Sequence, residues 1–131
     1  MSKQLVLLDH DGGVDDYLAT MLLMTMDRVE CLGIVVTPAD CYVNAAVSAT
    51  RKILDLMGGD RIPVAASTVR GINPFPRLYR RDSLIVDCLP ILNQQDTIRT
   101  PLVDRTGQEF TIQALLNAPE PVTLMVTGPL T

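Results

Sequence analysis

The sequence lacks several features that mark specialised classes of protein. Its three cysteines, Cys31, Cys41 and Cys88, are widely spaced and include no Cys-X-X-Cys pair, so neither a disulfide framework nor a zinc site is expected. No apolar run is long enough to span a bilayer, and no basic region followed by a long apolar stretch opens the chain. We therefore expect no membrane partner, a cytoplasmic location, and reduced cysteines that are mostly buried as small apolar side chains.

Positive charge is also scarce. The chain carries 11 Lys and Arg against 15 Asp and Glu, a net charge of −4, which argues against a nucleic acid as the main partner. This net negative charge is compatible with metal binding or with an uncharged substrate. With 47% hydrophobic residues in 131, and no repeats or low-complexity segments, the chain can bury one core. We expect a single domain without a disordered tail.

Strand and helix patterns alternate along the chain. Apolar runs typical of buried strands occupy residues 5–8, 29–36, 62–66 and 122–126. Patterns typical of helices occupy residues 14–27, 43–57, 82–92 and 110–117. This alternation builds βαβ units, so the predicted fold is α/β, a mainly parallel, Rossmann-like sheet flanked by helices on both faces.

The alternation fails between residues 68 and 82. An Asn-Pro-Phe-Pro sequence at residues 73–76 precedes a basic run with Arg77, Arg80 and Arg81. Proline and polar residues without periodicity indicate an exposed loop, and a loop of this length is a candidate lid over a site. The alternative is that the arginines bind an anion, although runs of charge are usually solvated.

Four aspartates, Asp9, Asp11, Asp15 and Asp16, lie within eight positions directly after the first predicted strand. The double glycine between them turns the chain into a helix, so the acids lie at the carboxyl end of the strand, where open α/β sheets bind ligands. Clustered carboxylates repel one another unless a positive ion separates them, and oxygen ligands favour Ca²⁺ or Mg²⁺. Acids that merely stabilise the first turn of a helix are the simpler alternative. The cluster favours metal-assisted hydrolysis, in which a carboxylate accepts a proton from water.

Two motifs carry a resemblance to a known family. Residues 9–16 read Asp-His-Asp-Gly-Gly-Val-Asp-Asp, and residues 124–131 read Leu-Met-Val-Thr-Gly-Pro-Leu-Thr. The first resembles the Asp-X-Asp-Pro-Gly-X-Asp-Asp signature of the inosine-uridine-type nucleoside hydrolases, and the second resembles their apolar strand followed by Thr-Gly-X-Leu-Thr. The resemblance implies the nucleoside hydrolase fold, a Ca²⁺ cofactor and a small-molecule substrate, a ribonucleoside whose N-glycosidic bond is cleaved.

The same resemblance implies how the cation and water would be held. Asp11 matches an acid that ligates calcium and acts as general base on the attacking water. Asp16 matches a second calcium-ligating aspartate, and Thr127 matches a threonine whose backbone carbonyl is a ligand. Asp9 matches an acid that supports the cluster.

Ribose binding and the turn are expected to differ from the family pattern. Asp15 matches the aspartate that holds the ribose hydroxyls, but Asp40 stands where the family supplies an asparagine. A carboxylate accepts hydrogen bonds and cannot donate as an amide does, so the sugar or base preference is expected to differ. Gly12 replaces the family's proline and predicts a looser turn. His10, the only histidine, is expected to pack locally rather than act in catalysis.

Further family residues come later in the family's chains, among them another aspartate ligand and a histidine that serves as leaving-group acid. Residues 1–131 are therefore expected to be the N-terminal portion of a single nucleoside hydrolase domain. Alone, this portion is expected to bind calcium weakly and to hydrolyse little or nothing. Apolar surface left exposed on its last strand would favour a homo-oligomer.

Two other classes stay open at this point. Haloacid-dehalogenase-like phosphatases also place Asp-X-Asp-Gly after an apolar strand, and Asp9 would then attack phosphate beside Mg²⁺ while Asp11 acted as acid and base. That family expects threonine or valine at the position of Gly13 and a downstream lysine, whereas the lysines here are Lys3 and Lys52. The third class is a non-catalytic, truncated domain used for assembly.

Overall fold

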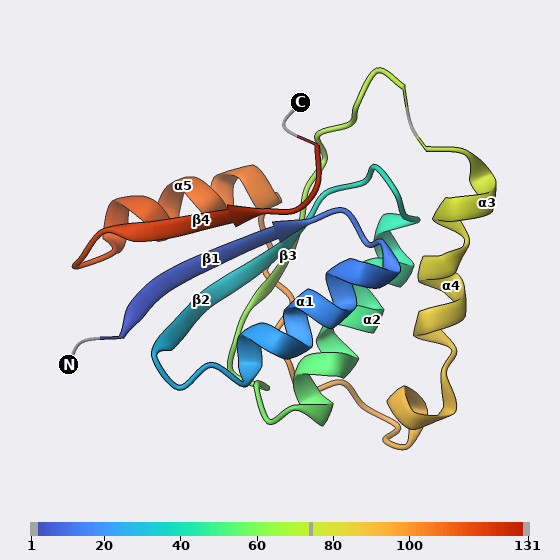
Figure 1. The fold of residues 1–131 in the computed structure, drawn as a ribbon, viewed down its shortest axis with the longest axis horizontal. Coiled ribbons are helices and arrows are strands. Elements are labelled where there is room, and N and C mark those ends of the chain that lie inside the picture. Colours follow the sequence, from blue (N-terminus) through green and yellow to red (C-terminus); the bar gives the residue numbers. More distant parts are fainter. Residues whose placement is uncertain (1–2, 74, 130–131) are drawn as a thin grey trace.

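The computed structural model describes residues 3–73 and 75–129 and contains a parallel sheet flanked by helices (Figure 1). The strands are β1 (Gln4–His10), β2 (Val29–Val36), β3 (Val64–Ala66) and β4 (Val122–Val126), in the spatial order β3-β2-β1-β4. The helices are α1 (Val14–Met24), α2 (Val43–Leu56), α3 (Arg77–Arg80), α4 (Asp82–Asp87), the 3₁₀ helix η1 (Pro90–Asn93) and α5 (Gly107–Asn117). The predicted α/β class is confirmed, and the carboxyl ends of all these strands lie at one edge of the sheet.

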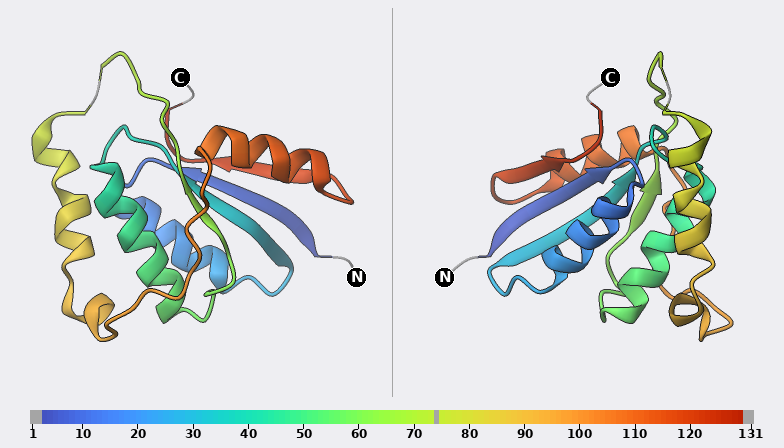
Figure 2. Two further views of the ribbon diagram at one scale, coloured as in Figure 1. Left: turned by 180° about the vertical axis from the view of Figure 1, so that it is seen from behind. Right: turned by 45° about the vertical axis from the view of Figure 1, so that its right-hand side comes forward.

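Helices cover both faces of the sheet (Figures 1 and 2). Helices α1 and α2 lie on one face and α5 on the other, while α4 packs against α2. Side chains alternate along β2 accordingly, because Ile34 and Val36 belong to the core beneath α2, whereas Gly33 faces the ring of Phe110 in α5. The expectation of helices on both faces is confirmed.

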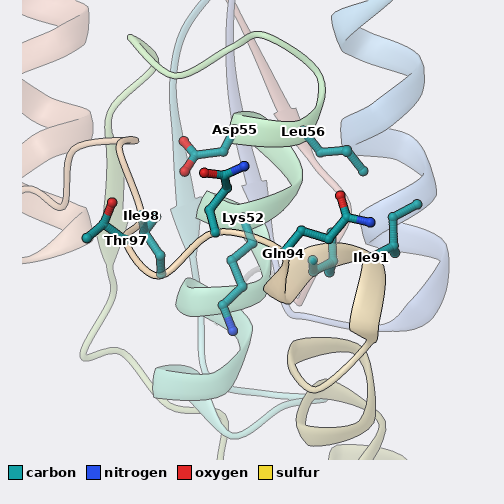
Figure 3. Close-up of a pocket in the computed structure, with 9 residues that line it drawn as sticks. Lys52, Asp55, Leu56, Ile91, Gln94, Thr97 and Ile98 are labelled. Atoms are coloured by element: carbon teal, nitrogen blue, oxygen red, sulfur yellow. The ribbon is translucent and has the colours of Figure 1, made fainter.

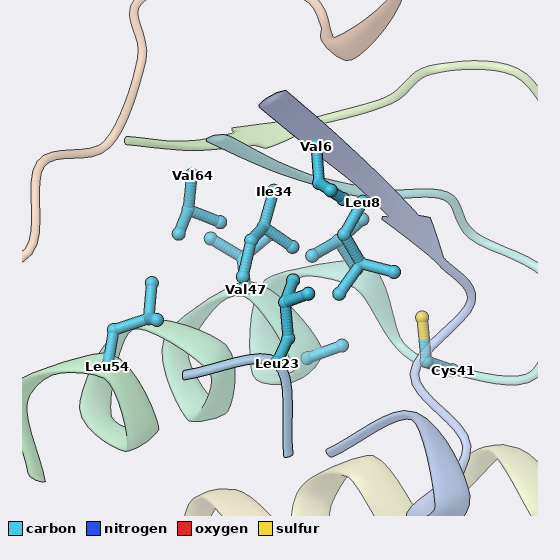
Figure 4. Packing of buried hydrophobic residues seen from close by; sticks show 10 residues of the cluster. Val6, Leu8, Leu23, Ile34, Cys41, Val47, Leu54 and Val64 are labelled. Atoms are coloured by element: carbon cyan, nitrogen blue, oxygen red, sulfur yellow. The ribbon is translucent and has the colours of Figure 1, made fainter. Parts of the chain in front are cut away.

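The main core lies between the sheet and the α1–α2 layer (Figure 4). It joins Val6 and Leu8 of β1 to Ile34 of β2, and Val47 and Leu54 of α2 close it. Leu8, Ile34 and Leu54 are completely buried. This packing fixes the position of β1, and therefore of the acidic residues that follow it.

Three predicted segments differ from the structure. Residues 82–92 do not form one helix, because α4 ends at Asp87 and Pro90, which lacks an amide N–H, opens η1 after an extended residue. The predicted loop over residues 68–82 contains the short helix α3. Helix α5 begins three residues early, at Gly107, because Thr106 and Glu109 form a capping box in which each side chain bonds the backbone N–H of the other.

The structure also tests what the sequence predicted about the cysteines and about membrane-spanning segments. Cys31, Cys41 and Cys88 are free thiols; Cys41 is buried and Cys31 half-buried, but Cys88 is exposed, so burial was wrongly predicted for it. In the described part of the chain, no helix has the length and apolar character needed to cross a membrane.

Candidate active site

The acidic turn, residues 9–16, joins β1 to α1. Gly12 has φ +78°, a conformation that proline cannot adopt and that other L residues adopt only with strain. A Cβ atom on Gly12 would lie 2.5 Å from Cβ of Cys41. Gly12 therefore lies closely against the loop that follows β2, and its backbone conformation is one that the family's proline could not adopt.

The side chain of His10 stabilises the acidic turn through two hydrogen bonds. The backbone N–H of Gly12 donates to Nδ1 of His10 at 3.1 Å, so the ring proton resides on Nε2 and points to Oγ1 of Thr50, also at 3.1 Å. Thr50 in turn donates to the carbonyl of Ala46 at 2.8 Å. Burial of the imidazole lowers the pKa of His10 to about 4, which keeps it neutral. Both ring nitrogens are thus engaged in structure, in line with the expected packing role.

The two sequence motifs meet because β4 pairs with β1. The N–H of Thr127 donates to the carbonyl of Asp9 at 2.9 Å, and Oγ1 of Thr127 donates to Oδ1 of Asp16 at 2.6 Å. Gly128 lies against Asp11, whose Cβ would be 2.9 Å from a Cβ on that glycine. Residues 130 and 131 of the second motif lie outside the described residues.

Asp11 and Asp16 form a carboxyl pair at the centre of the acidic turn. Both are buried, and a hydrogen bond between their side chains joins them. Burial, this hydrogen bond and the negative charges of Asp16 and Asp40 raise the pKa of Asp11 to about 7. The second oxygen of Asp16 accepts the N–H of Gly13 at 2.9 Å. Two carboxyls in contact must share either a proton or a cation.

The side chains of Asp15 and Asp40 both approach Gly13. A Cβ on Gly13 would lie 2.7 Å from Oδ1 of Asp15 and 3.3 Å from Oδ2 of Asp40, so glycine leaves the space between these side chains free. Within the described residues, the other oxygen of Asp40 is buried without a hydrogen-bond partner, and burial and the charge of Asp16 raise the pKa of Asp40. Asp15 is exposed. The pair offers acceptors to an incoming hydroxyl group.

Asp9 is held by a residue that the sequence reasoning missed. Oγ1 of Thr37 donates to Oδ1 of Asp9 at 2.8 Å, and the N–H of Thr37 donates to the carbonyl of His10 at the same distance. Burial raises the pKa of Asp9, although the Thr37 hydrogen bond opposes this. Thr37 directly follows the second predicted strand, so the rule that parallel strands end at one edge could have identified it.

A cation would find part of a binding site here. Among residues 3–73 and 75–129, no three or more His, Cys, Asp or Glu side chains are grouped to hold a metal ion. The Asp11–Asp16 pair alone offers fewer oxygens than the six to eight that Ca²⁺ takes. The pair does fit a hard cation, because its oxygen chemistry is suitable and its mutual repulsion would be relieved. Further oxygens would have to come from backbone, water, substrate or other residues.

A different pocket, of about 130 Å³, lies between α2 and η1 (Figure 3). Its charged groups are already paired, since Lys52 forms a 2.7 Å ion pair with Asp87 and Asp55 accepts hydrogen bonds from Arg99 and Thr100.

Comparison with known proteins gives a consistent result. The family model described as inosine-uridine preferring nucleoside hydrolase matches residues 6–131. The crystal structure of the inosine-uridine preferring nucleoside hydrolase from Bacillus anthracis is 46% identical with a TM-score of 0.94, and the match covers 97% of this chain and 42% of that one. The plant nucleoside hydrolase PpNRh1 is 20% identical, with a TM-score of 0.74 over 98% of this chain and 40% of its own, a likeness of fold alone.

Curated relatives agree. The probable uridine nucleosidase 2 of Oryza sativa subsp. japonica is 25% identical over 99% of this chain and 39% of its own length. The pyrimidine-specific ribonucleoside hydrolase RihA of Citrobacter koseri is 27% identical over 96% and 40%. The chain thus spans about 40% of the length of the curated relatives it matches. The match over residues 6–131 excludes the haloacid-dehalogenase-like phosphatase alternative. The chain belongs to the inosine-uridine preferring nucleoside hydrolase family.

Proposed function

We propose that this chain carries the water-activating part of an N-ribohydrolase, which splits a ribonucleoside into free base and ribose. The observation that supports this most directly is the meeting of the two motifs. Thr127 binds Asp16, and Gly128 lies against Asp11, although more than a hundred residues separate them in sequence. Such convergence at the carboxyl edge of a parallel sheet is typical of a ligand site.

Asp11 is proposed as the general base. Without a cation the pKa of Asp11 lies at about 7, and a bound Ca²⁺ would favour the carboxylate form that accepts a proton from water. A water molecule would transfer a proton to Asp11 while the water oxygen attacks the anomeric carbon of the ribose. The bond between that carbon and the nucleobase nitrogen would break, and its electron pair would leave with the nucleobase. Ca²⁺, which Asp11, Asp16 and the carbonyl of Thr127 are proposed to hold, would lower the pKa of such a water. Asp9, held by Thr37, would support the cluster.

Asp15 and Asp40 are proposed to bind the ribose hydroxyls. The buried oxygen of Asp40 that lacks a partner would accept a hydrogen bond from a sugar hydroxyl, which removes the cost of leaving it unsatisfied. The absence of a side chain on Gly13 leaves the room between the two acids.

Turnover measurements test this proposal. Protein expressed from its complete reading frame should release base from uridine or inosine in the presence of Ca²⁺, and a chelator should abolish the release. Residues 1–131, proposed to be the N-terminal portion of one domain, should by themselves turn over little or no substrate. Release that continues unchanged in chelator would contradict the role of the cation, and release from neither nucleoside would contradict the proposed function.

We also propose a homo-oligomer, because α5 and β4 carry exposed apolar side chains. Leu115 and Leu116 of α5 and Leu124 of β4 are exposed, the second of them at 75%, whereas apolar side chains of this size are usually covered. Size-exclusion chromatography with light scattering tests this, and a monomer would contradict it.

A further inference from the structure

Two threonines contact the acidic turn in the same way, from the two strands on either side of β1. In the sheet, β1 lies between β2 and β4 (Figure 1). Thr37 stands one residue beyond β2, and Thr127 stands one residue beyond β4. The N–H of Thr37 donates to the carbonyl of His10 at 2.8 Å, and the N–H of Thr127 donates to the carbonyl of Asp9 at 2.9 Å. Each threonine is therefore held against β1 by its backbone, independently of its side chain.

The hydroxyl groups of both threonines donate to carboxylates of the acidic turn. Oγ1 of Thr127 donates to Oδ1 of Asp16 at 2.6 Å, and Oγ1 of Thr37 donates to Oδ1 of Asp9 at 2.8 Å. Hydrogen bonds from a hydroxyl to an ionised carboxylate are about twice as strong as bonds between neutral groups, and the strongest are also the shortest. The Thr127 hydroxyl is therefore expected to orient its carboxylate more firmly than the Thr37 hydroxyl does.

Asp16 is held from two directions. Its Oδ1 accepts the Thr127 hydroxyl, and its Oδ2 accepts the N–H of Gly13 at 2.9 Å, so each oxygen is bonded to a different sequence motif. An ionised carboxylate has about four acceptor sites, so these two bonds leave others open to a cation. The side chain is 2% exposed. The entropy of ordering this carboxylate is thus lost when the chain folds rather than when a cation binds.

We propose that the hydroxyls of Thr37 and Thr127, the threonine pair, are positioning groups that set the affinity of the acidic turn for its cation. Without these donors, mutual repulsion would turn the carboxylates away from one another. Hydrogen-bond partners behind metal ligands contribute about 10–100-fold to metal affinity in other proteins. The inference rests on the proposed function, which places Ca²⁺ at Asp16. It assigns the hydroxyl of Thr127 a role separate from that proposed for its carbonyl.

Calorimetric titration of Ca²⁺ into the protein expressed from its complete reading frame tests the threonine pair without requiring turnover. Thr127→Val keeps the side-chain shape and the backbone N–H but removes the hydroxyl, and it should weaken Ca²⁺ binding by about tenfold or more. Thr127→Ser restores the hydroxyl and should stay within about threefold of the unaltered protein. Thr37→Val should weaken binding by only about threefold, because Asp9 is not one of the proposed ligands.

Thr25→Val is the matched control. Oγ1 of Thr25 donates to the carbonyl of Leu22 at 2.7 Å, at the far end of α1, the helix that carries Asp16. Loss of this hydroxyl should leave Ca²⁺ binding within about twofold of the unaltered protein. Equal losses of affinity in Thr25→Val and Thr127→Val would overturn the proposal, and so would a serine variant that binds as weakly as the valine variant.

Chemical denaturation in chelator separates positioning from folding. Thr127 is exposed, so Thr127→Val should unfold at about the same denaturant concentration as Thr25→Val although its Ca²⁺ affinity is lower. If Thr127→Val unfolded at a much lower concentration than Thr25→Val, the loss of affinity would reflect a weakened fold, and the positioning role would be overturned.

Uridine and inosine turnover, measured on the same preparations, distinguishes this proposal from the proposed function. Turnover by the unaltered protein, together with Ca²⁺ affinity that Thr127→Val leaves unchanged, would overturn the threonine pair and leave the hydrolase proposal intact. A tenfold loss of affinity that serine restores, without turnover of either nucleoside by the unaltered protein, would support the threonine pair and overturn the hydrolase proposal. Failure of the unaltered protein to bind Ca²⁺ would overturn the threonine pair and the proposed role of the cation together.

Discussion

Two charged regions flank the loop after β2, and they are built in opposite ways. The acidic turn, residues 9–16, is largely buried, and it is held by a hydrogen bond from the N–H of Gly12 to His10 and by hydrogen bonds from Gly13 and Thr127 to Asp16. The basic segment, residues 77–81, is mostly exposed, and of its arginines only Arg80 is partly buried. In the acidic turn, contacts within the fold hold most of the carboxylates in place. In the basic segment, the arginine side chains other than Arg80 are exposed to solvent.

The largest effect that would sharpen this comparison is on catalysis. Asp11→Asn removes the proposed base and should lower kcat for uridine by about 10²–10⁴-fold, because proton transfer by a positioned side chain contributes that much. Steady-state kinetics on protein from the complete reading frame would measure it. Asp27→Asn, at an exposed turn residue, is the control and should leave kcat unchanged. Equal rates for Asp11→Asn and the unaltered protein would rule out the base role.

Backbone conformation in the acidic turn should be the next most sensitive feature. Gly12→Ala should lower the free energy of unfolding by about 2–4 kcal/mol, since it combines a positive φ with a collision against Cys41. Gly58→Ala is a matched control, because Gly58 has φ +76° but nothing within 4 Å of its Cβ position, and it should cost about 1–2 kcal/mol. Chemical denaturation would measure both. Equal costs would show that the contact with Cys41 is unimportant.

His10 should matter through its two hydrogen bonds. His10→Leu leaves the N–H of Gly12 and the hydroxyl of Thr50 without their partner and should cost about 1–3 kcal/mol of unfolding free energy. His10→Gln retains an acceptor and a donor and should recover part of that loss. If the glutamine variant were less stable than the leucine variant, hydrogen bonding would not be the reason for this histidine.

The pH dependence of stability should reveal the carboxyl pair. Because the pKa of Asp11 is raised to about 7 in the fold, the folded protein holds a proton there that the unfolded chain has already lost. Its stabilising contribution is complete below the unfolded pKa of 3.8 and is lost as the pH rises through about 7. In chelator, the stability of the unaltered protein should therefore fall relative to Asp11→Asn over this range. Thermal melts at several pH values would measure it, and parallel pH profiles would contradict the shift.

The smallest effect should come from the basic segment. Arg77→Gln and Arg81→Gln change exposed charges and should each alter the free energy of unfolding by no more than about 0.5 kcal/mol. Chemical denaturation would again measure this. A loss comparable to that in Gly12→Ala would break the comparison, because it would show that the basic segment is as firmly built into the fold as the acidic turn.

The acidic turn was largely predictable because its spacing is local. A strand, two glycines and a helix in succession place Asp11 and Asp16 at the same edge of the sheet. The hydrogen-bond partners of this turn were harder to predict from the sequence, because Thr37 and Thr50 contact the turn only in the folded structure. Thr50 carries no sequence signal of this role, because it occupies an ordinary position on the buried side of α2.

The basic segment was harder to predict for a related reason. Helix α3 has four residues, too few for a periodic pattern, and its position depends on Ser83, which links Arg80 to Tyr42. The positive φ of Gly12 was also hidden, because a glycine in sequence does not reveal which conformation it adopts. Local pattern thus predicted the sheet and the acids, whereas the fit between loops required coordinates.

The pairing of β4 with β1 has a consequence for biosynthesis. The ribosome makes β1 first and β4 more than a hundred residues later, so one side of β1 is an unpaired edge for most of the time that the chain is emerging. Contacts between such distant residues also form slowly, because a long loop must close before they can form. Until β4 pairs with β1, the nascent chain therefore exposes a strand edge that can pair with other chains. The acidic turn also lacks its contacts with Thr127 and Gly128 until that pairing, so one late step completes both.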